Sequence, residues 1–163
     1  MTEENIVEVV VEIPKGSRNK YEYDEERGVM TFDRMLFSAM HYPGDYGFIP
    51  QTLGLDGDPI DALVLVSHAT FPGCHIRCRV AGVLNMSDEK GQDEKIICIP
   101  LGDPRWKDTD CLEDINEHYR KEIEHFFRVY KDLEQKKVQI DGWDDSKAAM
   151  KIIRDAEVRY NSK

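Results

Sequence analysis

The alternation of apolar and polar positions over the first hundred residues predicts strands. Some segments alternate with a period of two and others are short runs of β-branched residues, and both patterns are typical of sheets. The predicted strands are 6–13, 20–23, 28–34, 62–66, 75–86 and 95–100. The turn residues at 14–17 separate the first two strands, and the segment 24–28 predicts a hairpin between the second and third.

In the last third of the chain the apolar period changes to three or four, which predicts amphipathic helices. The positions of the first helix are Leu112, Ile115, Tyr119, Ile123, Phe126, Tyr130 and Leu133. Thr109 or Asp110 is its expected N-cap. A second helix is expected over about 146–160, capped by Asp144 or Asp145. Strands followed by helices predict the α+β class, with a small OB-like five-stranded Greek-key β-barrel and two C-terminal helices packed against it.

The segment 38–50 shows no clear period and is rich in aromatic residues, Gly and Pro. We expect an irregular loop here, either an ordinary packed loop or the wall of a site. Glu12 interrupts the apolar end of the first strand, so its carboxylate either faces water or points into a site.

Length and charge narrow the function classes. At 163 residues the chain is expected to form a single domain, 1–163. A formal net charge of −10 argues against nucleic acid as the main partner, although bound cations would still allow a small phosphate ligand. No run of about 18 apolar residues predicts a membrane span, and the polar, acidic residues 1–5 do not resemble a signal peptide.

The cysteines indicate a reducing compartment rather than a zinc site. Cys74, His75 and Cys78 form the only cluster, and it lacks the paired C-x-x-C spacing of zinc modules. We therefore expect structural thiols and a cytoplasmic location.

The strongest chemical signal is the acidic loop, Asp56-Gly57-Asp58-Pro59-Ile60-Asp61. Such a loop is either a solvated turn or a site where cations hold the carboxylates together, and hard oxygen ligands suit Mg²⁺, Mn²⁺ or Ca²⁺. An EF-hand is excluded, because its sixth and twelfth positions would hold Asp61 and Ser67 instead of Gly and Glu. The apolar run that follows places the acids at the mouth of a buried strand. A second acidic turn, 88–95, precedes the next strand and by itself reads as a charged hairpin tip.

An ordered set of motifs closely resembles the soluble family I inorganic pyrophosphatases. Its members are Glu12-Ile13-Pro14, Lys20-Tyr21-Glu22, Asp33-Arg34, Tyr42-Pro43-x-x-Tyr46-Gly47, the acidic loop 56–61, Asp88-Glu89 with Asp93 and Lys95, and His125-Phe126-Phe127 leading to Tyr130-Lys131-Asp132-Leu133-Glu134. The resemblance implies a Mg²⁺-dependent hydrolase of inorganic diphosphate, with several ions per site and Mn²⁺, Zn²⁺ or Co²⁺ as substitutes. It also implies an OB-like barrel and, in bacteria, a homohexamer.

The same resemblance implies roles for individual residues. The implied metal ligands are Asp56, Asp61, Asp88, Asp93 and Glu22. Two ions that share a hydroxide require a bridging carboxylate, and we assign that role to Asp61. Asp58 is the implied catalytic group, which orients or deprotonates the attacking water. The implied phosphate contacts are Lys20, Arg34, Tyr46, Lys95, Tyr130 and Lys131. Glu12 and Tyr42 are implied to line or support the site.

Other functions fit the sequence less well. A single-stranded nucleic-acid module needs a basic groove, which the net charge disfavours. A metal-binding homologue without activity would lack some of the matched positions, and none is missing. Nucleoside triphosphate hydrolysis is disfavoured because the chain has no G-x-x-x-x-G-K-[ST] loop.

Overall fold

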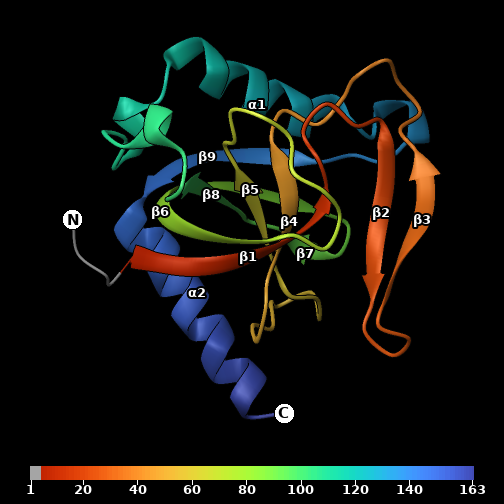
Figure 1. Cartoon of the computed structure of the whole chain (residues 1–163). Helices are drawn as coiled ribbons and strands as arrows, with labels where there is room; N and C mark the ends of the chain where they lie inside the picture. Colours follow the sequence, from red (N-terminus) through yellow and green to blue (C-terminus); the bar gives the residue numbers. More distant parts are fainter. Residues whose placement is uncertain (1–4) are drawn as a thin grey trace.

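Five strands close into a small barrel in the computed structural model, which describes residues 5–163 (Figure 1). They are β1 (Ile6–Ile13), β4 (Asp45–Ile49), β5 (Ile60–Val64), β8 (Lys95–Pro100) and β6 (His75–Asp88). They pair in that order, and β6 pairs back onto β1 to close the barrel. The β5–β8 pair is parallel and the other barrel pairs are antiparallel. The predicted OB-like barrel is therefore confirmed, whereas the prediction for residues 1–5 falls almost wholly outside the described residues.

The remaining elements surround this barrel. Strands β2 (Asn19–Asp24) and β3 (Val29–Met35) form a separate hairpin that stands beside the barrel in Figure 1. Strand β9 (Gln139–Asp145) and the short β7 (Gly91–Gln92) both pair with β6. Helix α1 (Glu117–Val129) lies above the barrel in this view and α2 (Ser146–Asn161) below it. Short 3₁₀ turns are η2 (Pro104–Trp106), η3 (Leu112–Asp114) and η4 (Asp132–Glu134).

The helix boundaries correct one prediction and confirm another. The first helix was expected to start after Thr109 or Asp110, but α1 starts at Glu117, where the Asn116 side chain accepts a hydrogen bond from the Tyr119 amide. Leu112 and Ile115 are buried as the period predicts, yet Ile115 has extended backbone angles that end η3. Burial alone therefore does not distinguish a 3₁₀ turn from a helix. The predicted cap of α2 is confirmed, because Asp145 accepts from the Ala148 amide.

Sequence reasoning missed β4 and β9, and also the two-residue β7 within the second acidic turn. The segment predicted to be irregular contains β4, whose five residues are almost fully buried. Gly47 makes this strand possible, because a Cβ at that position would overlap the carbonyl oxygen of Val10 in β1. Strand β9 was missed because its sequence, Gln-Ile-Asp-Gly-Trp-Asp-Asp, is polar and lies at the sheet edge.

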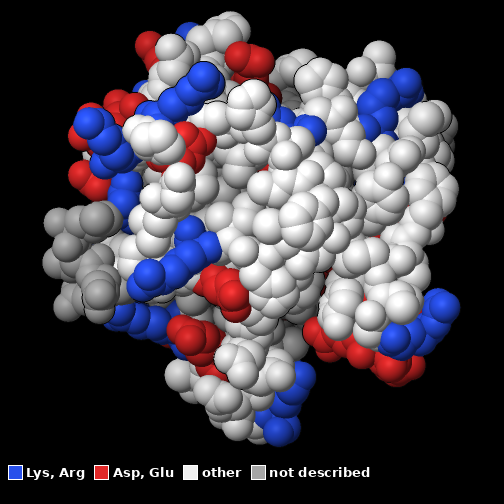
Figure 2. Space-filling model, viewed as in Figure 1, with Lys and Arg blue, Asp and Glu red and all other residues white. Residues whose placement is uncertain are grey.

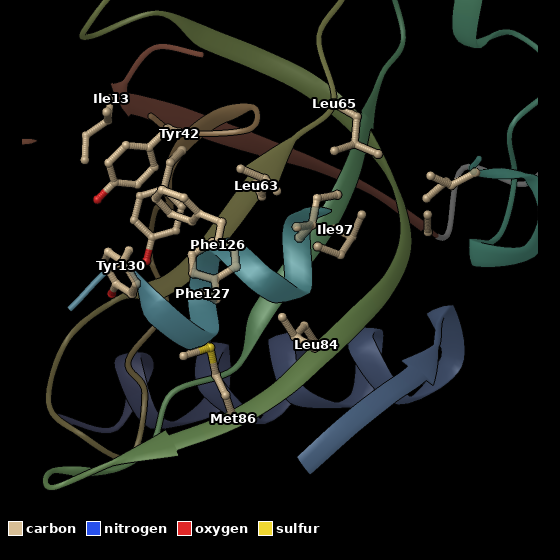
Figure 3. Packing of buried hydrophobic residues seen from close by; sticks show 14 of the residues in the cluster. Ile13, Tyr42, Leu63, Leu65, Leu84, Met86, Ile97, Phe126, Phe127 and Tyr130 are labelled. Carbon is tan, nitrogen blue, oxygen red and sulfur yellow. The ribbon is translucent and has the colours of Figure 1, made fainter. Parts of the chain in front are cut away.

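The core between α1 and the barrel contains a group of packed aromatic rings among its aliphatic side chains (Figure 3). The Tyr42 ring lies 4.7 Å from that of Phe126 and 5.4 Å from that of Tyr46, and the Phe126 and Tyr130 rings stack at 5.0 Å. The end of α1 is thus fixed against Tyr46 of β4. Within residues 5–163, no helix is both long and apolar enough to cross a membrane.

Candidate active site

The buried ammonium group of Lys95 is the centre of the site. Only 1% of Lys95 is exposed, and its Nζ donates to Tyr46 Oη at 2.7 Å and to Asp61 Oδ2 and Asp93 Oδ1 at 2.9 Å each. An ammonium has three protons, so these bonds use all of them. The ammonium also lies 5.2 Å from the Tyr46 ring and 5.5 Å from that of Phe127. The Lys95 cluster (Tyr46, Asp61, Asp93, Lys95) joins three strands and the second acidic turn.

The two carboxyl groups of this cluster have pKa values shifted in opposite directions. Burial raises the pKa of Asp61 to about 6, opposed by Lys95 and reinforced by Asp93. Burial would also raise the pKa of Asp93, but the positive charge of Lys95 and the hydrogen bond with Asp61 lower it. Two acids held this closely repel each other when both are ionised, and a bound cation relieves that repulsion.

The backbone of the acidic loop is held at its base. The Thr52 hydroxyl donates to the Ile49 carbonyl and accepts from the Ile60 amide, which closes the loop across the start of β5. The Gly54 amide donates to the Asp58 carbonyl at 2.7 Å. Within the loop, Asp56 Oδ1 accepts from the Asp58 amide at 3.0 Å, leaving the Asp58 side chain exposed to solvent.

Helix α2 also holds this loop from outside. The Leu53 amide donates to the Ala156 carbonyl at 3.0 Å, and Arg159 Nε donates to the Leu53 carbonyl at 2.8 Å. Both backbone groups of Leu53 are therefore bonded to α2, and the helix sets the position from which the acidic loop begins.

The carboxylates suit a hard divalent cation that keeps part of its water. Asp56, Asp61, Asp93 and Glu94 line one small cleft beside the loop. Among the described residues, no three His, Cys, Asp or Glu side chains are arranged as a complete ligand group. Mg²⁺ usually keeps several waters and binds through one or two carboxylates together with substrate phosphates. Asp61 and Asp93, which both bond Lys95, fit that requirement, and Asp56 lines the same cleft.

The β2–β3 hairpin carries paired charges. Lys20 Nζ lies 3.9 Å from Glu22 Oε1 and 3.7 Å from Asp33 Oδ2. Arg34 Nη1 contacts Asp33 Oδ2, and Arg34 Nη2 lies 2.9 Å from Glu134 Oε1 in η4. The side chain of Glu22 is 59% exposed. The implied metal ligand Glu22 and the implied phosphate contacts Lys20 and Arg34 thus share one hairpin, separate from the Lys95 cluster.

The segment after α1 supplies the remaining implied residues. Lys131 Nζ lies 4.0 Å from Asp88 Oδ2, which brings the second acidic turn against the end of α1. Burial raises the pKa of Tyr130 and of Tyr42, so both phenols remain protonated at neutral pH. The Tyr42 hydroxyl is buried and has no hydrogen-bond partner within residues 5–163. Tyr42 therefore packs in the aromatic wall beside the site.

Glu12 links the barrel to the hairpin. It sits at the bulge of β1, and its Oε2 accepts from the Tyr23 amide at 2.8 Å. Burial raises the pKa of Glu12 to about 7, opposed by that hydrogen bond and reinforced by Asp61 and Glu22. Glu12 is partly buried and bonded to the hairpin, and its role at the site stays a prediction.

Sequence reasoning assigned no role to Asp33, Glu134 or Thr52. Asp33 adjoins Arg34 in the sequence, so its charge was a usable signal. Glu134 meets Arg34 only through the tertiary fold, and Thr52 acts through backbone groups that no side-chain pattern reveals.

Comparisons with known proteins agree with the geometry. A family model described as "Inorganic pyrophosphatase" matches residues 9–161. An inorganic pyrophosphatase of Methanosarcina acetivorans is 55% identical over 163 residues, covering 100% of this chain and 97% of that protein. One of Halalkalibacterium halodurans is 52% identical, covering 97% of each chain. The crystal structure of the inorganic pyrophosphatase from Thermus thermophilus aligns with a TM-score of 0.94 at 44% identity, covering 99% of this chain and 94% of that one.

Proposed function

Because the chain belongs to the inorganic pyrophosphatase family, we propose that the Lys95 cluster, the acidic loop and the hairpin cations form its active site. The chain is a hydrolase that splits inorganic diphosphate into two orthophosphates. The observation that carries the proposed site is the Lys95 cluster, since it places two carboxylates next to a buried ammonium.

The family implies a divalent metal cofactor, and we assign it to Mg²⁺ with Mn²⁺, Zn²⁺ or Co²⁺ as substitutes. Asp56, Asp61 and Asp93 would hold the principal ions, because they line one cleft. Asp88 and Glu22 would hold further ions at the margins of the site. When bound, such ions neutralise substrate charge and lower the pKa of a coordinated water toward neutrality.

Asp58 is the proposed acceptor of the proton from the attacking water. Its side chain is exposed at the tip of the acidic loop, while its backbone amide is held by Asp56 and its carbonyl by Gly54. A carboxylate with a fixed backbone and a solvated side chain can take a proton and release it to solvent.

The proposed phosphate contacts are Lys20, Arg34, Tyr46, Lys95, Tyr130 and Lys131. Tyr46 and Tyr130 are suited to donate hydrogen bonds, because burial keeps the pKa of each phenol above its ordinary value. Lys95 uses all three protons within its cluster, so a direct contact with phosphate requires it to exchange one of them. The aromatic wall that includes Tyr42 and the link made by Glu12 would support these groups.

We also propose a cytoplasmic homohexamer as the working form. All four cysteines are free thiols, which supports a reducing compartment. Large apolar side chains, among them Phe32, Phe37 and Phe71, are more than half exposed, which supports association with further copies. The face in Figure 2 has a broad uncharged area bordered by mixed charges. Light scattering that gives the mass of one chain would refute the oligomer.

The test of the proposed site is phosphate release from diphosphate, with and without Mg²⁺, for the wild type and Asp58→Asn. We expect Mg²⁺-dependent release by the wild type, and loss of most turnover in the variant with metal affinity retained. Asp61→Asn is the comparison, because it should weaken metal binding. If Asp58→Asn loses metal affinity to the same extent, the division between proton acceptor and metal ligand is wrong.

A further inference from the structure

Glu134 holds Arg34 from the protein interior. It comes from η4, directly after Tyr130 and Lys131, and its Oε1 lies 2.9 Å from Arg34 Nη2 in β3. Its side chain is only 5% exposed, against 23% for that of Arg34. A carboxylate this deeply buried needs a partner, and Arg34 provides the positive charge.

This ion pair is engaged at only one of its two available contacts. Glu134 Oε2 and Arg34 Nε are both buried and have no hydrogen-bond partner in the described part of the chain. Buried polar atoms are usually paired, and here the two unpaired atoms belong to the two halves of one ion pair. A guanidinium edge and a carboxylate commonly form two parallel bonds. A small rotation of either group would join Nε to Oε2.

The opposite end of the guanidinium is held from the solvent side. Arg34 Nη1 contacts Asp33, whose side chain is 32% exposed and also lies 3.7 Å from Lys20. The Asp33 carboxylate thus occupies the position where an incoming anion would meet both cations. Glu134 is therefore the buried partner of Arg34, whereas Asp33 is the exposed partner that an incoming anion can replace.

We infer that Glu134 is a positioning residue for Arg34: it holds the Nε and Nη2 edge of the guanidinium, so that Nη1 is presented to a phosphate oxygen in place of Asp33. This inference rests on the proposed role of Arg34 in binding diphosphate. It explains why a negative side chain lies beside a site for a polyanion. The repulsion between Glu134 and the substrate anion is offset because the guanidinium of Arg34 is oriented before the substrate arrives.

Charge repulsion and orientation of Arg34 predict opposite effects of Glu134→Gln on anion binding. If Glu134 acted only through its charge, Glu134→Gln would strengthen the binding of anions by removing a nearby negative charge. If Glu134 orients Arg34, the same substitution weakens binding, because the new amide presents N–H groups or a poorer acceptor to the guanidinium.

The experiment measures KM and kcat for diphosphate, and the binding of orthophosphate by calorimetry, in the Mg²⁺-loaded protein. For Glu134→Gln we expect KM and the orthophosphate dissociation constant to rise by roughly tenfold to a hundredfold, the range for losing a charged hydrogen bond. Glu134→Asp keeps the charge but shortens the side chain, so an intermediate loss is expected. The control is Asp132→Asn, which removes an exposed charge from the same turn and should bind anions as well as the wild type or better.

A double-mutant cycle with Arg34→Lys separates positioning from general damage. If Glu134 acts through Arg34, Glu134→Gln has no further effect on orthophosphate binding in the Arg34→Lys background. Unchanged or tighter anion binding in Glu134→Gln overturns the inference, as does an additive loss in the double variant. Mn²⁺ binding without substrate should match the wild type, and a parallel loss of Mn²⁺ affinity would assign the effect to misfolding and overturn it too. A wild type without activity would instead refute the proposed site.

Discussion

Removing the buried ammonium of the Lys95 cluster is the most informative single perturbation. Lys95→Met keeps the length of the side chain and its contacts with the rings of Tyr46 and Phe127, since a thioether packs well against aromatic rings. It removes three hydrogen bonds of 2.7–2.9 Å and the only positive charge that bonds both Asp61 and Asp93 among the described residues.

The magnitude follows from the burial of the partners. The side chain of Asp61 is 27% exposed and that of Asp93 is 12% exposed, so solvent screens their charges poorly. Deleting one partner of a buried ion pair costs about 3–5 kcal/mol, because the remaining charge is left uncompensated. We therefore expect Lys95→Met to lower the free energy of unfolding by about 4 kcal/mol at pH 8 in EDTA.

The destabilisation caused by Lys95→Met should increase with pH. In the wild type the folded-state pKa of Asp61 is already raised from 3.8 to about 6, and Lys95 opposes that rise. Without Lys95 the pKa rises further, so the folded variant binds more protons than the unfolded chain. Stability is then retained below the unfolded pKa and is lost as the pH rises through the folded pKa. We expect the destabilisation at pH 5 to be about half that at pH 8.

Urea denaturation at pH 5 and pH 8, at one protein concentration, measures both effects. Added Mg²⁺ should stabilise Lys95→Met more than the wild type, because it replaces a missing positive charge. Lys147→Met, on the exposed face of α2, is the matched control and should change stability little at either pH. A destabilisation that is equal at pH 5 and pH 8 and does not respond to Mg²⁺ would refute the electrostatic account of the cluster.

Three further predictions follow from the same contacts. Glu12→Gln should leave the free energy of unfolding unchanged near pH 4 and raise it by about 3 kcal/mol at pH 8 in EDTA. The reason is that Glu12 has a folded pKa of about 7 against 4.5, so the wild type loses stability as the pH rises through that interval. A stability difference between variant and wild type that is the same at every pH, measured in urea, would contradict this. Gly47→Ala should destabilise the barrel by about 3 kcal/mol or more through backbone overlap, and a thermal midpoint within a degree of wild type would be incompatible with the register of β4. Arg159→Gln should weaken Mg²⁺ binding several-fold, because it releases the Leu53 carbonyl. The control is Arg154→Gln, which changes an exposed arginine of α2 and should leave Mg²⁺ binding unchanged. Equal Mg²⁺ affinities for the two variants in a calorimetric titration would show that α2 does not position the acidic loop.

The local features of this protein could be predicted from the sequence. The barrel strands β1, β6 and β8 were predicted at nearly their observed positions, because β-branched runs bounded by turns have few other structures available. The acidic loop was predicted to be the chemical centre because its three carboxylates, Gly and Pro are contiguous. Helix α2 was predicted correctly because its cap and apolar period are also local.

Tertiary structure alone decided how these features meet. The sequence marks Lys95 as an implied phosphate contact, but its burial and its bonds to carboxylates depend on the register of β5 and β8, which places Asp61 opposite it. Strand β4 exists only because Gly47 allows β1 to approach, and Glu134 gains a partner only when η4 packs against β3. In each case the contact joins residues distant in the chain, so its energy depends on strand register and packing, which side-chain periodicity does not encode.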